Sequence, residues 1–561
     1  MKDKIDRRTF LKSAGKAAVV LSAVPGIGIT APSSFDVVIK GATILDGTGG
    51  VPFTGDIGIS GDMIAEVGDI PKERSKKYID ASGLYLSPGF IDMHSHSDFS
   101  LPAYPTADSR VRQGITTEVT GNCGGSAAPL FGLAREESIK ESVDDYGFSP
   151  DWTDVASYFA SLEKRKISIN QAMLLGQGTL RSSIVGLEDR KATADEMRAL
   201  IRAVEEGMDQ GAIGLSTGLE YSPGLFTPTE EIVEMTRVVA RRNGLYSSHM
   251  RNEEANVLEA VNEAVNIGRL TGARVEISHL KAAGRPNWVK QQAAIDLIES
   301  ARRQGIEALA DAYPYTAYST GLTVLFLPWV LDGGTKAMME RLQDPTQRAR
   351  IRKELIEYVT NDPGDYNLIV ISNLPSEKNK DCIGLNIAQI AEKWKVEPVD
   401  AILRLIQEEQ GSVSYVGHAM SPENVELVLS NPLVMIGSDG YSMSPSGKAV
   451  RSKPHPRSYG TYPRVLGYYV REKHLFDLPV AIKKMTSMPA EHAGINDRGR
   501  IARGKKADLV IFDAKTVKEI STYEDPHRYP AGILHVFVNG TQVVENANHT
   551  GARPGRVLRK A

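Results

Sequence analysis

Histidines, one cysteine and one aspartate follow short apolar segments at several distant places in the sequence. These residues are His94, His96, Cys123, His249, His279 and Asp439. Side chains at i and i+2 of an extended chain point the same way, so His94 and His96 can face one metal ion. Imidazole, thiolate and carboxylate donors together favour zinc over magnesium or calcium, which prefer oxygen ligands. The set therefore predicts a zinc-type metal site.

This mixture of donors predicts hydrolytic chemistry. A zinc site with one position open to water is typical of hydrolases, because the metal lowers the pKa of its bound water towards about 7. Asp439 would accept the proton of that water and pass it to a leaving amine. A lone histidine at the end of a strand is more often structural, and only the joint occurrence of these donors predicts the site.

Short apolar runs rich in β-branched residues precede these side chains. Eight such runs occur, at 90–93, 115–120, 172–175, 213–216, 245–248, 275–278, 307–310 and 433–436. Helical patterns lie between several of them, as at 194–210 and 253–270. Alternating strands and helices with eight buried strands predict an α/β fold with a (β/α)8 TIM-type barrel, in which catalytic groups lie at the carboxyl ends of the strands.

The two ends of the chain have a different sequence pattern, which predicts short strands separated by Gly and Asp turns. We expect residues 35–87 and 491–561 to form the two parts of one small β-sandwich, with the barrel inserted between them at 88–490. The connection between the seventh and eighth barrel strands is too long for a single helix. It predicts an inserted, lid-like subdomain at 320–425.

Composition excludes several classes of protein. The chain has 561 residues, of which 41% are apolar and 24% charged, close to a soluble globular average. A formal net charge of −3 gives no reason to expect nucleic acid as a partner. The only cysteines are Cys123 and Cys382, which excludes a disulfide framework and a four-cysteine zinc site. We expect Cys382, in the insertion, to be inert.

Residues 1–34 read as an export signal. Arg7-Arg8 followed by Phe10-Leu11-Lys12 resembles the twin-arginine type, although Asp6 stands where Ser or Thr is usual. The uncharged run at 17–35 is too short and too interrupted to span a bilayer. The pattern predicts the twin-arginine (Tat) export machinery as a partner, a periplasmic or secreted location, and no stable membrane span after processing.

Longer motifs make a family resemblance specific. They include Pro88-Gly-Phe-Ile-Asp-Met-His-Ser-His, Gly121-Asn-Cys-Gly, Gly214-Leu-Ser-Thr-Gly-Leu-Glu-Tyr-Ser-Pro-Gly, Ser248-His-Met-Arg-Asn-Glu, Ser278-His-Leu-Lys, Tyr313-Pro-Tyr-Thr-Ala-Tyr-Ser-Thr, Gly437-Ser-Asp-Gly, His455-Pro-Arg and Gly504-Lys-Lys-Ala-Asp-Leu-Val. The chain resembles the amidohydrolase superfamily and, within it, the D-aminoacylase (N-acyl-D-amino-acid deacylase) family. The matching segments span essentially the whole mature chain.

The resemblance implies a role for each metal ligand. Cys123 would bridge two metal positions, in place of the carboxylated lysine of many relatives. Cys123, His249 and His279 would hold one tightly bound zinc ion. His94 and His96, with Cys123 and Asp439, would form a second, weaker position, and Asp439 would be the general base and acid.

The resemblance also implies a substrate site. Lys281, Tyr313 and Ser319 match positions that hold the substrate's α-carboxylate, and Tyr221 matches a residue near the scissile amide. An ammonium group close to the metal ligand His279 would attract an anionic substrate. Arg457 lies near the same rim and is a weaker candidate for substrate contact. Arg251 and Glu253, after His249, would pair with each other or orient that histidine.

The resulting hypothesis is zinc-dependent hydrolysis of N-acyl-D-amino acids to a carboxylate and a free D-amino acid. The nearest alternative is another amidohydrolase activity, such as dipeptide or cyclic-amide hydrolysis, because fold and metal do not determine the substrate. A non-catalytic exported metal-binding protein is a third possibility. Asp439 disfavours it, since a pure binding site needs no proton acceptor.

Overall fold

A computed structural model describes residues 34–361, 364–445 and 451–560 of the chain. The expected export signal, apart from its final residue Ser34, lies outside the described residues. Among the helices that are described, none combines the length and the apolar character needed to cross a bilayer.

The centre of the molecule is a nearly closed barrel of parallel strands. All eight strands predicted from the sequence are confirmed, with hydrogen-bonded order β16-β12-β11-β10-β9-β8-β7-β6. They are β6 (Phe90–Asp92), β7 (Ile115–Thr120), β8 (Asn170–Gly176), β9 (Gly214–Gly218), β10 (Leu245–His249), β11 (Arg274–Ile277), β12 (Ala308–Ala312) and β16 (Val434–Ile436). The first and last strands meet just beyond their ends, where the Asp439 amide donates to the His94 carbonyl at 2.7 Å.

Apolar side chains fill the barrel and explain the sequence pattern of its strands. Met93, Val119, Leu174, Leu245 and Met435 belong to one buried cluster inside it. Strands buried on both faces read as continuous apolar runs, which is the texture of these segments.

Helices surround the barrel. The helices outside the insertion are α2 (Ser100–Ala103), α3 (Asp108–Val111), α4 (Gly132–Tyr146), α5 (Val155–Arg165), α6 (Gln177–Ile184), α7 (Ala194–Asp209), α8 (Thr229–Arg241), α9 (Val257–Thr271), α10 (Gln291–Arg303), α16 (Pro422–Ser430), α17 (Arg457–Arg464), α18 (Leu478–Met485) and α19 (Ser487–Ala493). Thr193 and Glu196 form a reciprocal capping box that begins α7. The helix expected at 253–270 begins instead at Val257, because Asn252 accepts backbone hydrogen bonds from Glu254 and Asn256 in the preceding loop.

Both ends of the chain join in a second sheet. Its nine strands are β1 (Phe35–Ile44), β2 (Phe53–Ser60), β3 (Met63–Gly68), β4 (Ser75–Asp80), β5 (Tyr85–Pro88), β17 (Leu509–Phe512), β18 (Ile533–Val538), β19 (Thr541–Glu545) and β20 (Asn548–His549). β17 pairs with β5, which links the C-terminal strands to the N-terminal ones in a single hydrogen-bonded sheet. Ile39, Ile57, Leu509 and Phe537 share one core cluster, so neither end has a complete core alone.

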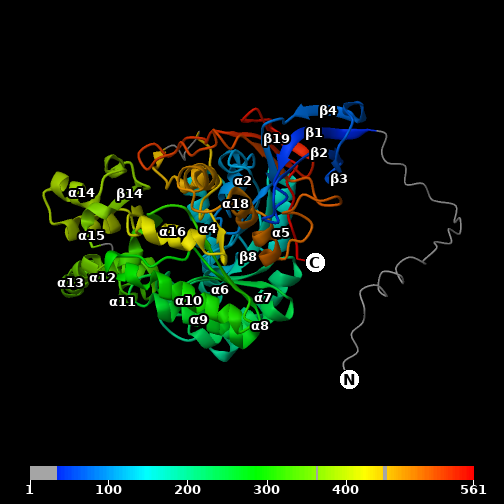
Figure 1. Cartoon of the computed structure of the whole chain (residues 1–561). Coiled ribbons are helices and arrows are strands. Elements are labelled where there is room, and N and C mark those ends of the chain that lie inside the picture. The colour runs from blue at the N-terminus through cyan, green and yellow to red at the C-terminus, as the bar shows by residue number, and fades with distance from the viewer. Residues whose placement is uncertain (1–33, 362–363, 446–450, 561) are drawn as a thin grey trace, which may run out of the picture.

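The long connection between β12 and β16 contains the expected insertion. Its elements are β13 (Tyr318–Gly321), α11 (Pro328–Leu331), α12 (Gly334–Gln343), α13 (Pro345–Asn361), β14 (Ile369–Asn373), α14 (Ile387–Trp394), α15 (Pro398–Glu408) and β15 (Ser414–Gly417). The three strands form a small antiparallel sheet, and the segment has a hydrophobic core of its own. Figure 1 shows α13 to α15 on the side of the molecule away from β1 to β4. Cys382 is fully buried in the insertion's core.

Candidate functional site

The predicted metal ligands lie together at the carboxyl ends of the barrel strands. We call His94, His96, Cys123, His249, His279 and Asp439 the metal rim. Three of them have left-handed backbone conformations, with φ of 52° at Cys123, 35° at His279 and 54° at Asp439. Such φ values are uncommon for residues other than glycine, and they persist where the surrounding structure imposes them. The packing around the rim therefore imposes these backbone conformations.

Donor atoms in the rim have the spacing of ligands around one ion. His94 Nε2 lies 3.2 Å from Cys123 Sγ, which lies 3.4 Å from His279 Nε2. Tetrahedral zinc with ordinary bond lengths separates neighbouring nitrogen and sulfur donors by roughly 3.3–3.6 Å. His96 Nε2 lies 2.9 Å from Asp439 Oδ1, which lies 3.7 Å from His94 Nε2. The donor set therefore fits zinc in both chemistry and spacing.

Three overlapping groups of donors can be formed, each with its atoms within 4.8 Å of one another. They are His94 with Cys123 and His279, His94 with His96 and Asp439, and His249 with Glu253 and His279. The overlap suits two adjacent ions better than one. His249 also contacts both other members of the expected tight set, with its Nδ1 2.9 Å from His279 Nε2 and a hydrogen bond to Cys123.

The electrostatics of the rim favour a cation. Burial alone would lower the pKa of His96, but Asp439 and Cys123 raise it to about 9. Burial would raise the pKa of the Cys123 thiol, but His94 and His279 hold it well below its ordinary value. A thiolate and carboxylates in a buried pocket stabilise positive charge, whether carried by protons or by a metal ion.

Carboxylates behind the rim orient its imidazoles. Asp311 Oδ2 lies 3.2 Å from His94 Nδ1, and Asp311 Oδ1 accepts a hydrogen bond from the His279 amide at 3.0 Å. Glu220 Oε2 lies 3.2 Å from His249 Nε2. Such contacts fix the ring orientation of metal-binding histidines. The sequence interpretation missed both acids; an aspartate inside the apolar run of β12 was the available signal for Asp311.

Glu253 has other partners than those expected from the sequence. Arg251 pairs with Glu263 at 2.8 Å, so the expected Arg251–Glu253 pair is wrong. Glu253 instead lies 2.9 Å from His279 Nδ1 and 2.5 Å from Lys281 Nζ. The loop after β10 turns so that Glu253 contacts His279 and Lys281. The direction of that turn could not be deduced from the sequence.

Asp439 is held as an ionised carboxylate. Burial would raise its pKa, but Arg457 and the neighbouring imidazoles hold the pKa well below the ordinary range. Arg457 Nη1 donates to Asp439 Oδ2 at 2.7 Å, and Nη2 donates to the Ser319 carbonyl at 3.2 Å. Arg457, a weak candidate from sequence, therefore joins the acid of the rim to the first strand of the insertion.

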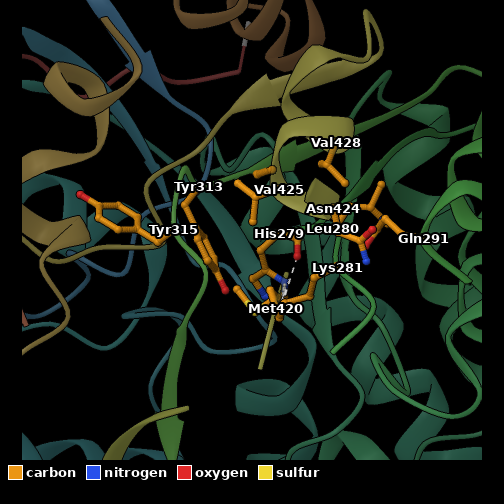
Figure 2. Close-up of a pocket in the computed structure, with 11 residues that line it drawn as sticks. His279, Leu280, Lys281, Gln291, Tyr313, Tyr315, Met420, Asn424, Val425 and Val428 are labelled. Atoms are coloured by element: carbon orange, nitrogen blue, oxygen red, sulfur yellow. Dashed lines mark hydrogen bonds between the residues drawn. The ribbon is translucent and has the colours of Figure 1, made fainter. Parts of the chain in front are cut away.

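Lys281 and Tyr313 follow neighbouring barrel strands, β11 and β12, and both line the small cavity that Figure 2 shows. Lys281 is buried, and Glu253 raises its pKa against the lowering effect of burial. Tyr313 Oη is buried and has no hydrogen-bond partner among the described residues. Burial raises the pKa of Tyr313 to about 12, although Lys281 opposes the shift, so the hydroxyl keeps its proton and can donate.

The remaining predicted residues line the same opening. A cavity of about 280 Å³, here called the rim cavity, is lined in part by Cys123, Asp439, Tyr221 and Ser319. Thr320 Oγ1 donates to Tyr221 Oη at 3.1 Å, and the Tyr221 ring lies 4.6 Å from the His249 ring. A further cavity of about 30 Å³, here called the lysine cavity, is lined by Lys281. It shares Tyr221, Ser319 and Asp439 with the rim cavity. Metal donors, a carboxylate, and a tyrosine donor thus surround one connected space.

Comparison with known proteins gives a consistent result. The model of the amidohydrolase family matches residues 77–301 and 402–544. An N-acyl-D-glutamate deacylase of Alcaligenes xylosoxydans xylosoxydans is 36% identical over 94% of this chain and 96% of its own length.

Two solved structures are similar along nearly the whole chain. One is N-acyl-D-glutamate deacylase from Bordetella bronchiseptica with zinc and a phosphonate inhibitor that mimics the tetrahedral intermediate, with 34% identity, a TM-score of 0.79, and coverage of 94% of this chain and 100% of that one. The other is a D-aminoacylase described for its binuclear metal centre, with one-metal activation and second-metal attenuation. It is 33% identical with a TM-score of 0.79, and again 94% of this chain and 100% of that one are covered.

Proposed function

The chain belongs to the amidohydrolase family, and from that premise we propose that it is a zinc-dependent N-acyl-D-amino-acid deacylase. It hydrolyses the amide bond of a small N-acyl-D-amino acid, releasing a carboxylate and a free D-amino acid. Relatives at 33–36% identity over most of the chain are N-acyl-D-glutamate deacylase, D-aminoacylase and N-acyl-D-aspartate deacylase. The single observation in the structure that carries the proposal is the convergence of the metal rim on a cavity lined by Tyr313, whose hydroxyl has no partner among the residues that the structure describes.

The rim residues would hold the metal. His94, His96, Cys123, His249, His279 and Asp439 are the ligands of our proposal, with one zinc bound tightly and a second more weakly. Zinc bound there would polarise the amide carbonyl and make a water molecule acidic enough to attack at neutral pH. Elemental analysis at increasing zinc concentration tests this, and loss of the tight ion in Cys123→Ala would support the assignment.

Asp439 performs the proton transfers. It accepts a proton from the attacking water and delivers it to the amide nitrogen as the carbon–nitrogen bond breaks. Arg457 keeps Asp439 ionised, which suits the first transfer. Because Arg457 occupies one carboxylate oxygen, the other faces the imidazoles and the cavity.

The substrate's α-carboxylate binds at the lysine cavity. Tyr313 Oη donates to it from a buried position, where an unmade hydrogen bond would otherwise cost about 1–3 kcal/mol. Lys281 provides positive charge while remaining paired with Glu253. Ser319 lies between the lysine cavity and the rim cavity, and Tyr221 packs against His249 beside the scissile amide.

Assay of the purified protein on N-acetyl-D- and N-acetyl-L-amino acids, with and without a chelator, tests this function. We expect turnover of D-substrates only, lost on chelation and restored by zinc. Hydrolysis of dipeptides or cyclic amides without turnover of N-acyl-D-amino acids would instead favour another amidohydrolase activity. Zinc binding without turnover of any amide would indicate a non-catalytic protein.

We further propose that the twin-arginine machinery exports the folded protein to the periplasm or beyond. The proposal is supported by Arg7-Arg8, the uncharged run that follows, and the advantage of loading Cys123 with metal before exposure to an oxidising compartment. Cell fractionation tests it. Replacement of both arginines by lysine should retain the protein in the cytoplasm, and unchanged location of that variant would refute the proposal.

A further inference from the structure

A second large cavity adjoins the rim cavity and contains none of the predicted metal ligands. Its volume is about 220 Å³. It shares Ser319, Ser414, Tyr441 and Arg457 with the rim cavity, so the two spaces are continuous. Strands β13 to β15 of the insertion form one wall, and α2 with the end of α4 contributes another. We call it the serine-lined cavity.

Hydroxyl groups dominate the lining of this cavity. Seven serines line it, namely Ser100, Ser319, Ser372, Ser414, Ser442, Ser452 and Ser458, together with three tyrosines, Tyr104, Tyr146 and Tyr441. Met443 and Pro454 are the only lining residues without a polar side-chain group among those the structure describes. A subsite for an alkyl chain would be lined by aliphatic side chains, as ligand pockets for apolar groups are.

Two of these hydroxyls lack partners. Ser100 is 1% exposed and Ser442 is 0% exposed, and the Oγ atom of each has no hydrogen-bond partner within the described part of the chain. Leaving a buried hydroxyl unsatisfied is unfavourable. Neither oxygen has accessible surface, so an occupant of the cavity would meet its lining at partly exposed hydroxyl residues such as Ser414 and Tyr441.

The position of the cavity indicates which part of the substrate enters it. With the amide at the metal rim, the α-carboxylate lies towards Lys281 and Tyr313, which do not line the serine-lined cavity. Ser319, the third residue predicted to hold the carboxylate, lines both spaces and marks the boundary between them. The group on the other side of the amide bond is the acyl group. It would pass Tyr441 and Ser414, which line both the rim cavity and the serine-lined cavity.

We propose that the serine-lined cavity is the acyl subsite and that it selects acyl groups larger than acetyl that carry hydrogen-bonding groups, over alkyl chains of the same length. This inference rests on the deacylase function proposed above. It extends that function by naming the chemical class of the acyl group, which neither the metal nor the carboxylate site determines.

Matched substrates test the proposal. The probes are the N-acetyl, N-hexanoyl and N-gluconoyl derivatives of whichever D-amino acid is turned over fastest as its N-acetyl form. Hexanoyl and gluconoyl groups have the same number of carbon atoms and differ in hydroxylation. We expect kcat/KM for the gluconoyl substrate to exceed that for the hexanoyl substrate by at least about tenfold, the effect of one or two hydrogen bonds.

Two variants connect the selectivity to the cavity. Ser414→Ala and Tyr441→Phe should each lower the gluconoyl-to-hexanoyl ratio about three- to tenfold, since each removes one neutral hydrogen bond from the lining that the acyl group passes. Ser430→Ala, an exposed serine of α16, is the control and should leave the ratio unchanged.

Failure of this inference differs from failure of the proposed function. Turnover of the N-acetyl substrate with hexanoyl equal to or better than gluconoyl would overturn the acyl subsite alone. Changes at Ser414 or Tyr441 that alter selectivity for the D-amino acid side chain, and not for the acyl group, would also overturn it. Absence of turnover for every N-acyl-D-amino acid would overturn the deacylase function, and this inference with it.

Discussion

The metal rim and the base of the barrel both bury charged side chains, but their polar atoms point in different directions. At the base, Asp508 pairs with Arg498, accepts from the Asn539 amide at 2.6 Å and accepts from Asn170 Nδ2 at 3.0 Å. We call these four residues the base cluster. They connect the strands of the terminal sheet to the start of β8, and their polar groups are turned on one another.

At the rim, by contrast, donors and acceptors converge on a cavity. Three rim residues have left-handed backbones, and Tyr313 Oη nearby is unpaired within the described residues. Both regions match family motifs in the sequence, since Asp508 belongs to the Gly504 motif and Asp439 to the Gly437 motif. Buried charge therefore does not by itself identify an active site. Buried polar atoms that face a shared cavity do identify one, and variants in the two regions should differ in their effect on turnover.

The largest effect expected is on turnover in Asp439→Asn. Loss of the general base and acid should lower kcat at least about a hundredfold, because positioned proton transfer contributes about 10²–10⁴ to a rate. The oxygen of asparagine keeps the shape of the site, so we expect the content of tightly bound zinc, by elemental analysis, to stay close to that of the wild type. The melting temperature should fall, because buried Arg457 loses its counter-ion. Wild-type turnover would remove Asp439 from its catalytic role.

Asp508→Asn should destabilise the protein without lowering its turnover. It leaves the buried Arg498 without its principal counter-ion, and the free energy of unfolding should fall by about 3 kcal/mol, while kcat of the folded enzyme is unchanged. Chemical denaturation and a parallel activity assay measure both quantities. Asp525→Asn, which removes an exposed pair with Arg528, is the control and should cost less than about 1 kcal/mol. A large loss of kcat in folded Asp508→Asn would erase the distinction between the two regions.

Lys281→Met should affect substrate binding more than chemistry. We expect KM for N-acetyl-D-amino acids to rise about ten- to a hundredfold, the effect of one charged hydrogen bond, with a smaller change for the corresponding neutral amides. Steady-state kinetics on both substrate types give the answer, with Lys336→Met on the exposed face of α12 as the control. An equal rise for both substrates would refute recognition of the carboxylate by Lys281.

A smaller effect concerns pH and a buried histidine that packs beside the first residue of β11. Burial, assisted by Arg274 and Arg302, lowers the pKa of His492 to about 3. The unfolded chain binds this proton near pH 6.5 and the folded chain does not. The contribution of neutral His492 to the free energy of unfolding is therefore fully present above pH 6.5 and is lost as the pH falls below it. On acidification from pH 7 to 5.5, this one group should lower the free energy of unfolding by about 1 kcal/mol.

Denaturation of His492→Gln at both pH values measures that contribution. The variant should lose about 1 kcal/mol less than the wild type on acidification, whatever its stability at pH 7. His474→Asn, at an exposed histidine, should retain the wild-type difference. An identical pH dependence in His492→Gln would show that the folded protein accommodates the proton at this site.

The barrel strands and the rim donors could be predicted because each carries a local signal. A strand buried on both faces reads as an apolar run, and a histidine, cysteine or aspartate directly after such a run stands out. All eight strands and the coming together of six donors followed from these two patterns.

Contacts between distant segments carry no such signal. Asp311 supports His94 across 217 positions of sequence, and Glu220 meets His249 across 29. Glu253 follows Arg251 closely, yet its partners are Lys281 and His279, because the turn after β10 could not be deduced from spacing. The single hydrogen-bonded terminal sheet likewise depends on the pairing of β17 with β5, which only the fold establishes.

The most direct test of the central claim is the hydrolysis of N-acetyl-D-amino acids by the zinc-loaded wild type and Asp439→Asn, each measured for bound zinc in the same sample. We predict equal content of tightly bound zinc, turnover of D- but not L-substrates by the wild type, and loss of at least about a hundredfold in the turnover of the variant. Turnover by the wild type that persists after complete removal of zinc, or that is equal in the zinc-loaded variant, would contradict it.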